Sequence, residues 1–139
     1  MIKIKYDLNL MKFMSFFESL TNTRLKDCFV DKNSLLVFVV EENQIAKAIG
    51  KKGINVKNIK EKLNRKIKIV EFNPHLETFV ANLINPLKAN EIKIDDKIVT
   101  IVGPDTKTKG LLIGRNGQNL RNYEDIVNRY FDIKEIKVI

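Results

Sequence analysis

Hydrophobic and polar positions in the first half of the chain follow a helical period, then a strand pattern, then a helical period again. Between Asp7 and Leu20 the apolar residues recur at steps of three and four, and Asp7 is a suitable helix cap. The stretches LKDCFV (25–30) and LLVFVV (35–40) predict strands, and the near-continuous apolar run of the second indicates burial on both faces. The core side chains expected in the first helix are Leu10, Phe13, Phe16, Phe17 and Leu20. The remaining elements predicted here are helices at about 43–49 and 54–64 and a strand at 66–70.

The second half of the chain repeats this order. It predicts a helix at 75–86, strands at 91–94 and 98–102, a helix capped by Asp105 and ending near Ile113, a helix ending near Tyr130 and a strand at 133–139. When the halves are aligned at an offset of 64 residues, GINVKN (53–58) lies on GQNLRN (117–122) and Cys28 lies on Ile92. We therefore predict an internal repeat with domains at 1–72 and 73–139, and a core position for Cys28.

Two glycine pairs occupy matching positions in this repeat, each between two predicted helices. The first lies in AIGKKG (48–53) and the second in LIGRNG (112–117). Because glycine destabilises a helix, such a pair marks a place where the backbone bends or is approached closely. Neither nucleotide-binding motif fits: a Walker loop needs a glycine where Thr108 stands, and the dinucleotide motif G-x-G-x-x-G lies between a strand and a helix.

A G-x-x-G turn between two helices suits the backbone of a single-stranded nucleic acid. Without Cβ atoms the turn can lie against a phosphodiester chain, and the helix that follows offers free N–H groups and a partial positive charge. Lys51, Lys52 and Arg115 add attraction for phosphate. A KH domain holds about four nucleotides in this way.

The order of elements decides which KH subtype fits. In one subtype the accessory helix and strand follow the β-α-α-β unit, and in the other, type II, they precede it. Only type II uses every predicted element of both halves, including residues 7–30. We therefore predict an α+β protein of two tandem type II KH domains, each a three-stranded sheet covered by helices.

The charge of the chain supports a polyanionic partner. The formal net charge is +8 over 139 residues, and such an excess favours nucleic acid. Residues 41–70 hold nine Lys and Arg against three Glu, whereas residues 105–134 hold six against four acidic residues. We expect the first glycine loop to bind phosphate more strongly than the second, where Asn116 replaces a basic residue.

Composition also narrows the function classes. No apolar run is long enough to span a bilayer and the start of the sequence lacks a secretory signal, so we expect a cytoplasmic protein without membrane contact. We also expect a monomer. One cysteine and one histidine, His75, supply neither a disulfide nor a metal cluster. No carboxylate pair stands out, and we expect no metal, no cofactor and no enzymatic activity.

Four stretches of the sequence resemble the archaeal NusA family, and together they span nearly the whole chain. They are FESLTNTRLKDCFVD (17–31), AIGKKGINVKNIKEKL (48–63), KIVEF (68–72) and LLIGRNGQNLRN (111–122). The resemblance implies two tandem type II KH domains that bind single-stranded RNA in transcription termination or antitermination. It also implies RNA polymerase as a further partner.

The resemblance implies two RNA-binding grooves, one in each domain. The first would comprise Ile49, Gly50, Lys51, Lys52, Gly53, Asn55, Val56 and Lys57, and the second Ile113, Gly114, Arg115, Asn116, Gly117, Asn119, Leu120 and Arg121. Three matching pairs have an alternative role. Asn55 and Asn119 could bond local backbone instead, Ile49 and Ile113 could serve both core and groove, and Lys57 and Arg121 could be solvated helix charges.

Two other functions share some of these features. A KH protein of ribosome assembly or RNA decay would have the same loops in a different pathway. A helix-turn-helix DNA-binding protein also joins two helices by a glycine-containing turn. It does not explain two glycines in each turn or the buried strand before each first helix.

Overall fold

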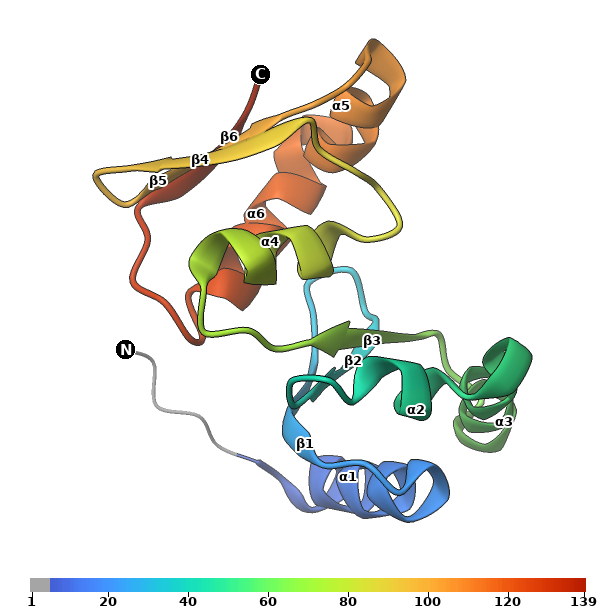
Figure 1. Ribbon diagram of the computed structural model, residues 1–139. Helices are drawn as coiled ribbons and strands as arrows, with labels where there is room; N and C mark the ends of the chain where they lie inside the picture. Colours follow the sequence, from blue (N-terminus) through green and yellow to red (C-terminus); the bar gives the residue numbers. More distant parts are fainter. Residues whose placement is uncertain (1–5) are drawn as a thin grey trace. The chain divides into compact units, whose positions relative to one another are not determined.

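The chain folds as two compact units with the same order of elements. The computed structural model describes residues 6–139, and the units divide between Asn73 and Pro74. The first unit contains α1 (Leu8–Thr21), β1 (Leu25–Val30), β2 (Leu36–Val40), α2 (Ile45–Ile49), the 3-10 turn η1 (Lys51–Gly53), α3 (Ile54–Leu63) and β3 (Ile67–Glu71) (Figure 1). The second contains α4 (Leu76–Ile84), β4 (Glu91–Asp95), β5 (Ile98–Val102), α5 (Thr106–Ile113), the 3-10 turn η2 (Arg115–Gly117), α6 (Gln118–Val127) and β6 (Glu135–Val138).

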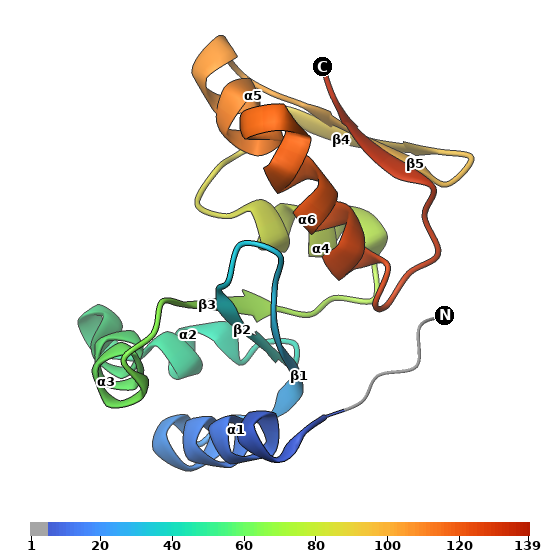
Figure 2. The same ribbon diagram turned by 180° about the vertical axis from the view of Figure 1, so that it is seen from behind.

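Each unit contains one three-stranded sheet whose last strand runs parallel to its neighbour. β1 pairs antiparallel with β2 and β2 pairs parallel with β3, and β4, β5 and β6 repeat this arrangement. Parallel neighbours need a long crossover, which α2 with α3 and α5 with α6 provide. Within each unit the helices lie on one face of the sheet (Figure 2). The predicted α+β fold of two tandem type II KH domains is confirmed.

The core of the first unit forms where α1, α2 and α3 pack on the sheet. All five residues of β2 are buried, as the continuous apolar run predicts. Phe17 of α1 stacks on Phe38 of β2 with ring centroids 4.3 Å apart. Cys28 is fully buried in the same cluster, which confirms its predicted role as a small core residue.

The expectation that Leu20 belongs to this core is wrong. Its side chain is 38% exposed, whereas Phe17 is fully buried. Three helix positions separate the two residues, so Leu20 is rotated about 60° from the direction of Phe17. It lines a shallow hollow between α1 and α3 instead.

Helix α4 ends earlier than the sequence pattern predicts, at Ile84 rather than near Pro86. Asn85 has φ −53° and ψ 136°, an extended conformation. The residue before a proline is disfavoured in the helical region because the proline ring collides with its backbone. The helix therefore ends two residues before Pro86, with its apolar stripe complete.

Helix α6 is also shorter than predicted and ends at Val127 rather than near Tyr130. The chain turns there, and the Asn128 side-chain oxygen accepts a hydrogen bond from the N–H of Ile133 at 3.1 Å. The turn places the rings of Tyr130 and Phe131 within 5.4 and 5.7 Å of the Phe79 ring. Aromatic packing of these residues replaces a last helical turn.

The start of α5 provides a test of local stability. Asp105 accepts a hydrogen bond from the N–H of Thr108 at 2.7 Å, and this bond lowers the pKa of its carboxyl group. A lowered folded pKa stabilises the fold above the unfolded value, and the gain disappears as pH falls through the folded pKa. We expect Asp105→Ala to lower the melting temperature at pH 7, with the difference from the natural chain shrinking below about pH 4.

The matched control is Asp105→Asn, which keeps an acceptor for the cap but cannot titrate. Thermal unfolding followed by circular dichroism between pH 2 and 7 would measure all three proteins. An alanine variant as stable as the natural chain at pH 7 would contradict the capping role.

Candidate nucleic-acid interface

The two glycine loops have the same backbone conformation. We call Gly50–Gly53 the first loop and Gly114–Gly117 the second loop. Gly50 has φ 80° and ψ 170°, and Gly114 has φ 75° and ψ 175°. Each loop ends in a glycine with left-handed geometry, at φ 73° and ψ 20° in the first and φ 75° and ψ 15° in the second. The repeat seen in the sequence is therefore a repeat of loop geometry.

The first glycine of each loop is required by both conformation and space. A φ near 80° with ψ near 170° is a region that essentially only glycine adopts. A Cβ atom on Gly50 would lie 2.9 Å from the side-chain nitrogen of Asn55, and one on Gly114 would lie 2.7 Å from Cγ of Asn119. The asparagine side chain occupies the place that a larger residue would need.

The last glycine of each loop is open on its outer side. A Cβ atom on Gly53 or Gly117 would meet nothing within 4 Å. The helix that follows each of them has no side-chain cap at its N-terminus. The N–H of Ile54 donates to the carbonyl of Lys51, and the N–H of Gln118 donates to the carbonyl of Arg115. The positive end of each helix dipole still favours an anion near these turns.

The third position of each loop also has positive φ. Lys52 and Asn116 both have φ 55° and ψ 27°. Asparagine adopts this left-handed region much more readily than lysine. The second loop thus has the residue better suited to the conformation, whereas the first has a charge for phosphate.

Asn55 and Asn119 bond backbone across their loops. The side-chain nitrogen of Asn55 donates to the carbonyl of Lys47 at 3.2 Å, and that of Asn119 donates to the carbonyl of Leu111 at 2.8 Å. Both acceptors lie eight residues earlier, in the helix before the loop. This is the alternative role that the sequence left open, although the partner is a preceding helix rather than the local turn.

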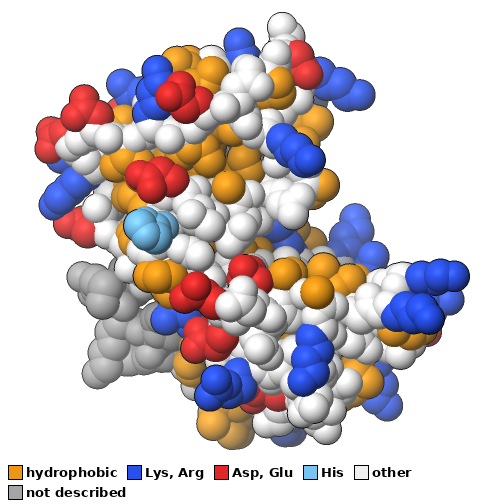
Figure 3. Space-filling model, viewed as in Figure 1, with side chains coloured by type: hydrophobic (Ala, Val, Ile, Leu, Met, Phe, Trp, Pro, Cys, Tyr) orange, Lys and Arg blue, Asp and Glu red, His pale blue; other side chains and the backbone are white. Residues whose placement is uncertain are grey.

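The basic side chains concentrate on the first unit. The exposed lysines of this region are Lys47, Lys51, Lys52, Lys57, Lys60, Lys62 and Lys66. Figure 3 shows Lys and Arg side chains gathered at the end of the first unit where α2 and α3 lie. Lys68 differs, because it is half-buried in β3 and burial lowers its pKa.

Arg115 and Asn116 of the second loop are exposed, but Arg121 is bound to a carboxylate. Its guanidinium donates to both oxygens of Glu124 at 2.9 and 3.1 Å, which raises its pKa. Glu124 also accepts a hydrogen bond from the N–H of Ile136 in β6 at 2.8 Å. Arg121 is therefore not a freely solvated charge, whereas Lys57 is exposed on α3.

Apolar side chains flank both loops, and sequence reasoning missed two of them. Ile49, Val56, Ile113 and Leu120 are half-buried, so each can contribute to the core and also contact a ligand. Ile54 and Leu111 are 48% and 49% exposed. Ile54 directly follows Gly53, and its side chain lies over Gly50, since a Cβ there would be 3.0 Å from it. In the sequence, a large apolar residue directly after the G-x-x-G turn could have identified Ile54 as a further groove residue.

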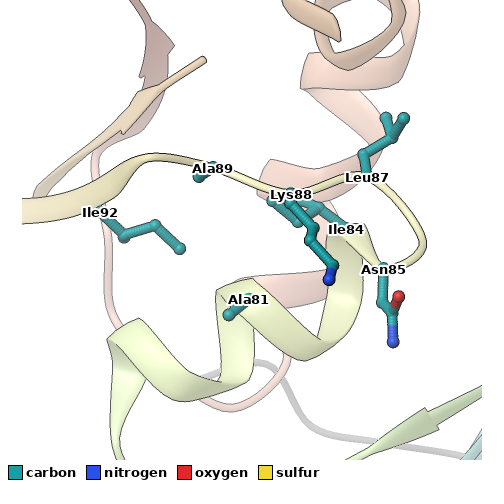
Figure 4. A pocket seen from close by; sticks show the side chains of 7 residues that line it. All are labelled: Ala81, Ile84, Asn85, Leu87, Lys88, Ala89 and Ile92. Atoms are coloured by element: carbon teal, nitrogen blue, oxygen red, sulfur yellow. The ribbon is translucent and has the colours of Figure 1, made fainter. Parts of the chain in front are cut away.

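A separate hollow lies in the second unit between α4 and the segment leading to β4. It has a volume of about 290 Å³ and is lined by Ala81, Ile84, Asn85, Leu87, Lys88, Ala89 and Ile92 (Figure 4). The lining is mainly apolar, and none of these side chains is a carboxylate, histidine or cysteine. Across residues 6–139 no group of three or more His, Cys, Asp or Glu residues could hold a metal ion. None of the helices described is long and apolar enough to cross a membrane.

Comparison with known proteins identifies both units. Residues 14–74 match the family model described as KH domain, and residues 76–139 match the one described as NusA-like second KH domain. The chain is 32% identical to the probable transcription termination protein NusA of Methanococcus vannielii, covering 99% of this chain and 81% of that protein. It is 31% identical to the protein of the same name from Thermoplasma acidophilum, covering 99% and 97%.

A solved structure shares the fold over almost the full length. The crystal structure of APE1850 superimposes with a TM-score of 0.74 and 27% sequence identity, covering 96% of this chain and all of that one. Two KH domains in succession, the NusA-like character of the second and full-length similarity to archaeal relatives all agree. The chain therefore belongs to the archaeal NusA family.

Proposed function

We propose that this protein binds single-stranded RNA with its two glycine loops and acts in transcription termination or antitermination. The observation that carries the proposal is the pair of loops with one backbone conformation, each placed directly before a helix whose N-terminus has no side-chain cap. The proposed occupant of each loop is a short run of the RNA backbone. The position of the chain in the archaeal NusA family supports the pathway.

The first loop would hold phosphate by three means. Gly53 leaves its outer side open, so the RNA backbone can lie against the main chain. The N–H of Ile54 donates to the carbonyl of Lys51 within the turn. The start of α3 would therefore attract phosphate through its helix dipole, which favours a negative charge. Lys51 and Lys52 are exposed and would add attraction over a longer range.

The bases would then lie beside the loops, against the apolar side chains there. The two units present different chemistry at matching positions. Ile54 corresponds to Gln118, and Lys47 corresponds to Leu111 at the same offset of 64 residues. Half-exposed Ile54 and Leu111 offer surfaces for unstacked bases. Ile54 in the first unit and Leu111 in the second are therefore added to the predicted groove residues.

The proposed setting is the cytoplasm, with RNA polymerase as a partner alongside RNA. The relatives are named as probable transcription termination proteins, which supports a role at the polymerase over ribosome assembly or RNA decay. Affinity purification from cells should recover polymerase subunits with this protein. Recovery of pre-ribosomal particles in their place would move the protein to the alternative pathway.

A binding experiment tests the RNA proposal directly. Fluorescence anisotropy would compare a labelled single-stranded RNA of about eight nucleotides, enough for two KH domains, with a duplex DNA of equal charge. We expect the single-stranded RNA to bind more tightly at every salt concentration. Equal or tighter binding of the duplex would contradict the proposal and favour non-specific attraction to a basic protein.

Salt dependence should differ between the two loops. Each phosphate contact on a single strand contributes about −0.7 to the slope of log affinity against log salt concentration. An Arg115→Asp variant binds mainly through the first loop, and a Lys51→Asp variant shifts binding toward the second. We expect the first variant to have a slope steeper by about 0.7, which corresponds to one additional contact, because the first loop holds two cations and the second holds one. Equal slopes would mean that the lysines around the first loop do not face RNA.

A further inference from the structure

One feature shared by the two units is a hydrogen bond between the helices on either side of the loop. We propose that Asn55 and Asn119 are positioning residues that hold the loops in their binding conformation before RNA arrives, and that their amides do not themselves contact RNA. The inference rests on the proposed RNA-binding function. It concerns how the site is built rather than what it binds.

The hydrogen bond satisfies a helix end. The N–H of Gly50 donates to the carbonyl of Ala46 at 3.0 Å, which is the last regular bond of α2. The next carbonyl, that of Lys47, accepts from the Asn55 side chain. In the second unit Gly114 bonds the carbonyl of Gly110, and the next carbonyl accepts from Asn119. Terminal carbonyls of a helix need such external donors.

The same side chain fixes the loop by shape. A Cβ atom added to the first glycine would lie too close to this side chain. The distance would be 2.9 Å to Nδ2 of Asn55 in the first unit and 2.7 Å to Cγ of Asn119 in the second. The first glycine and the asparagine thus form a matched pair at a spacing of five residues in both units, Gly50 with Asn55 and Gly114 with Asn119. The asparagine fills the space and the glycine leaves it free.

The contact needs a short side chain that donates a hydrogen bond, and asparagine supplies one. A carboxylate of the same shape accepts hydrogen bonds but cannot donate to a carbonyl. An alanine leaves the carbonyl without this partner and leaves the space beside the glycine empty. With the amide nitrogen engaged by the protein backbone, the loop is ordered in the free protein, and RNA binding does not have to order it.

The experiment uses the full chain with Asn55→Ala, and Asn58→Ala as the matched control. Asn58 is an exposed residue of the same helix, one turn further on. Affinity for a single-stranded oligouridylate of about eight nucleotides would be measured by anisotropy. Exchange of the Gly53 amide proton would be measured by NMR without RNA. We expect Asn55→Ala to weaken binding about 5-fold, as for loss of one hydrogen bond, and to speed amide exchange. Asn58→Ala should change neither.

Double substitutions test the steric pairing independently of RNA. The loss in urea midpoint for Gly50→Ala should be smaller in the Asn55→Ala background, because the collision with the amide is absent. The loss for Gly53→Ala should be the same in both backgrounds, because its Cβ meets nothing within 4 Å. An Asn55→Asp variant should also lose protection of the Gly53 amide, since it has the shape without the donor.

The outcomes separate the positioning role from the RNA proposal. If the natural chain fails to bind RNA, the proposed function fails, while amide exchange and the double substitutions still report on the asparagine. Weaker RNA binding by Asn55→Ala with unchanged exchange at Gly53 would show a direct contact with RNA and would overturn the positioning role. Unchanged exchange together with additive glycine effects would overturn it as well.

Discussion

A variant with Lys51→Asp and Lys52→Asp should bind single-stranded RNA about 100-fold more weakly than the natural chain. Both side chains are exposed in the first loop, next to the uncapped start of α3. Reversing them replaces attraction for phosphate with repulsion at the place where the backbone of RNA would lie. It also leaves the second loop to bind alone, so the gain from two linked contacts on one strand is lost. Anisotropy at constant salt measures the change.

The fold should survive this substitution. Aspartate tolerates the positive φ of position 52, and exposed side chains contribute little to stability, with changes usually within about 0.5 kcal/mol. The control is Lys12→Glu with Lys88→Glu, the same change of charge at exposed positions outside the loops. Loss of cooperative unfolding in the loop variant, or an equal loss of affinity in the control, would contradict the assignment of phosphate binding to the first loop.

The largest expected effect on stability comes from the first glycine of the second loop. We expect Gly114→Ala to lower the free energy of unfolding by about 3 kcal/mol, since its conformation is essentially restricted to glycine. The added Cβ would also lie 2.7 Å from Cγ and 2.9 Å from the backbone nitrogen of Asn119. Urea unfolding followed by circular dichroism would give the value.

Two glycines of the same unit serve as controls, and their substitutions should change the free energy of unfolding in opposite directions. Gly117 has φ 75° but open space around a Cβ, so Gly117→Ala should cost only about 1 kcal/mol. Gly110 lies inside α5, also in open space, and Gly110→Ala should stabilise the unit by about 0.5–1 kcal/mol. Similar losses at Gly110 and Gly114 would show that loop conformation is not the cause.

The sequence was sufficient for the order of elements and for the loops, because both depend on local patterns. Periodicity located the strands and helices, and paired glycines at equal spacing located the turns. Cys28 could be assigned to the core by its alignment with Ile92. These inferences use spacing along the chain, which the fold preserves.

Contacts between distant residues could not be predicted in the same way. The asparagine bonds reach eight residues back across the loop, and the sequence offered only an open choice between RNA and local backbone. The pairing of Arg121 with Glu124 depends on β6, because Glu124 is held there by the N–H of Ile136. The early end of α6 follows from packing of Tyr130 and Phe131 on Phe79. Each outcome is decided by tertiary neighbours.

The central claim is that both glycine loops contact RNA. An NMR titration of the labelled full chain with a single-stranded RNA of about eight nucleotides tests it most directly. We expect the amide signals of Gly50–Gly53 and Gly114–Gly117, and of the first turns of α3 and α6, to shift or broaden most. Unperturbed loop signals, with changes concentrated instead around the hollow lined by Ala81 and Ile92, would contradict it.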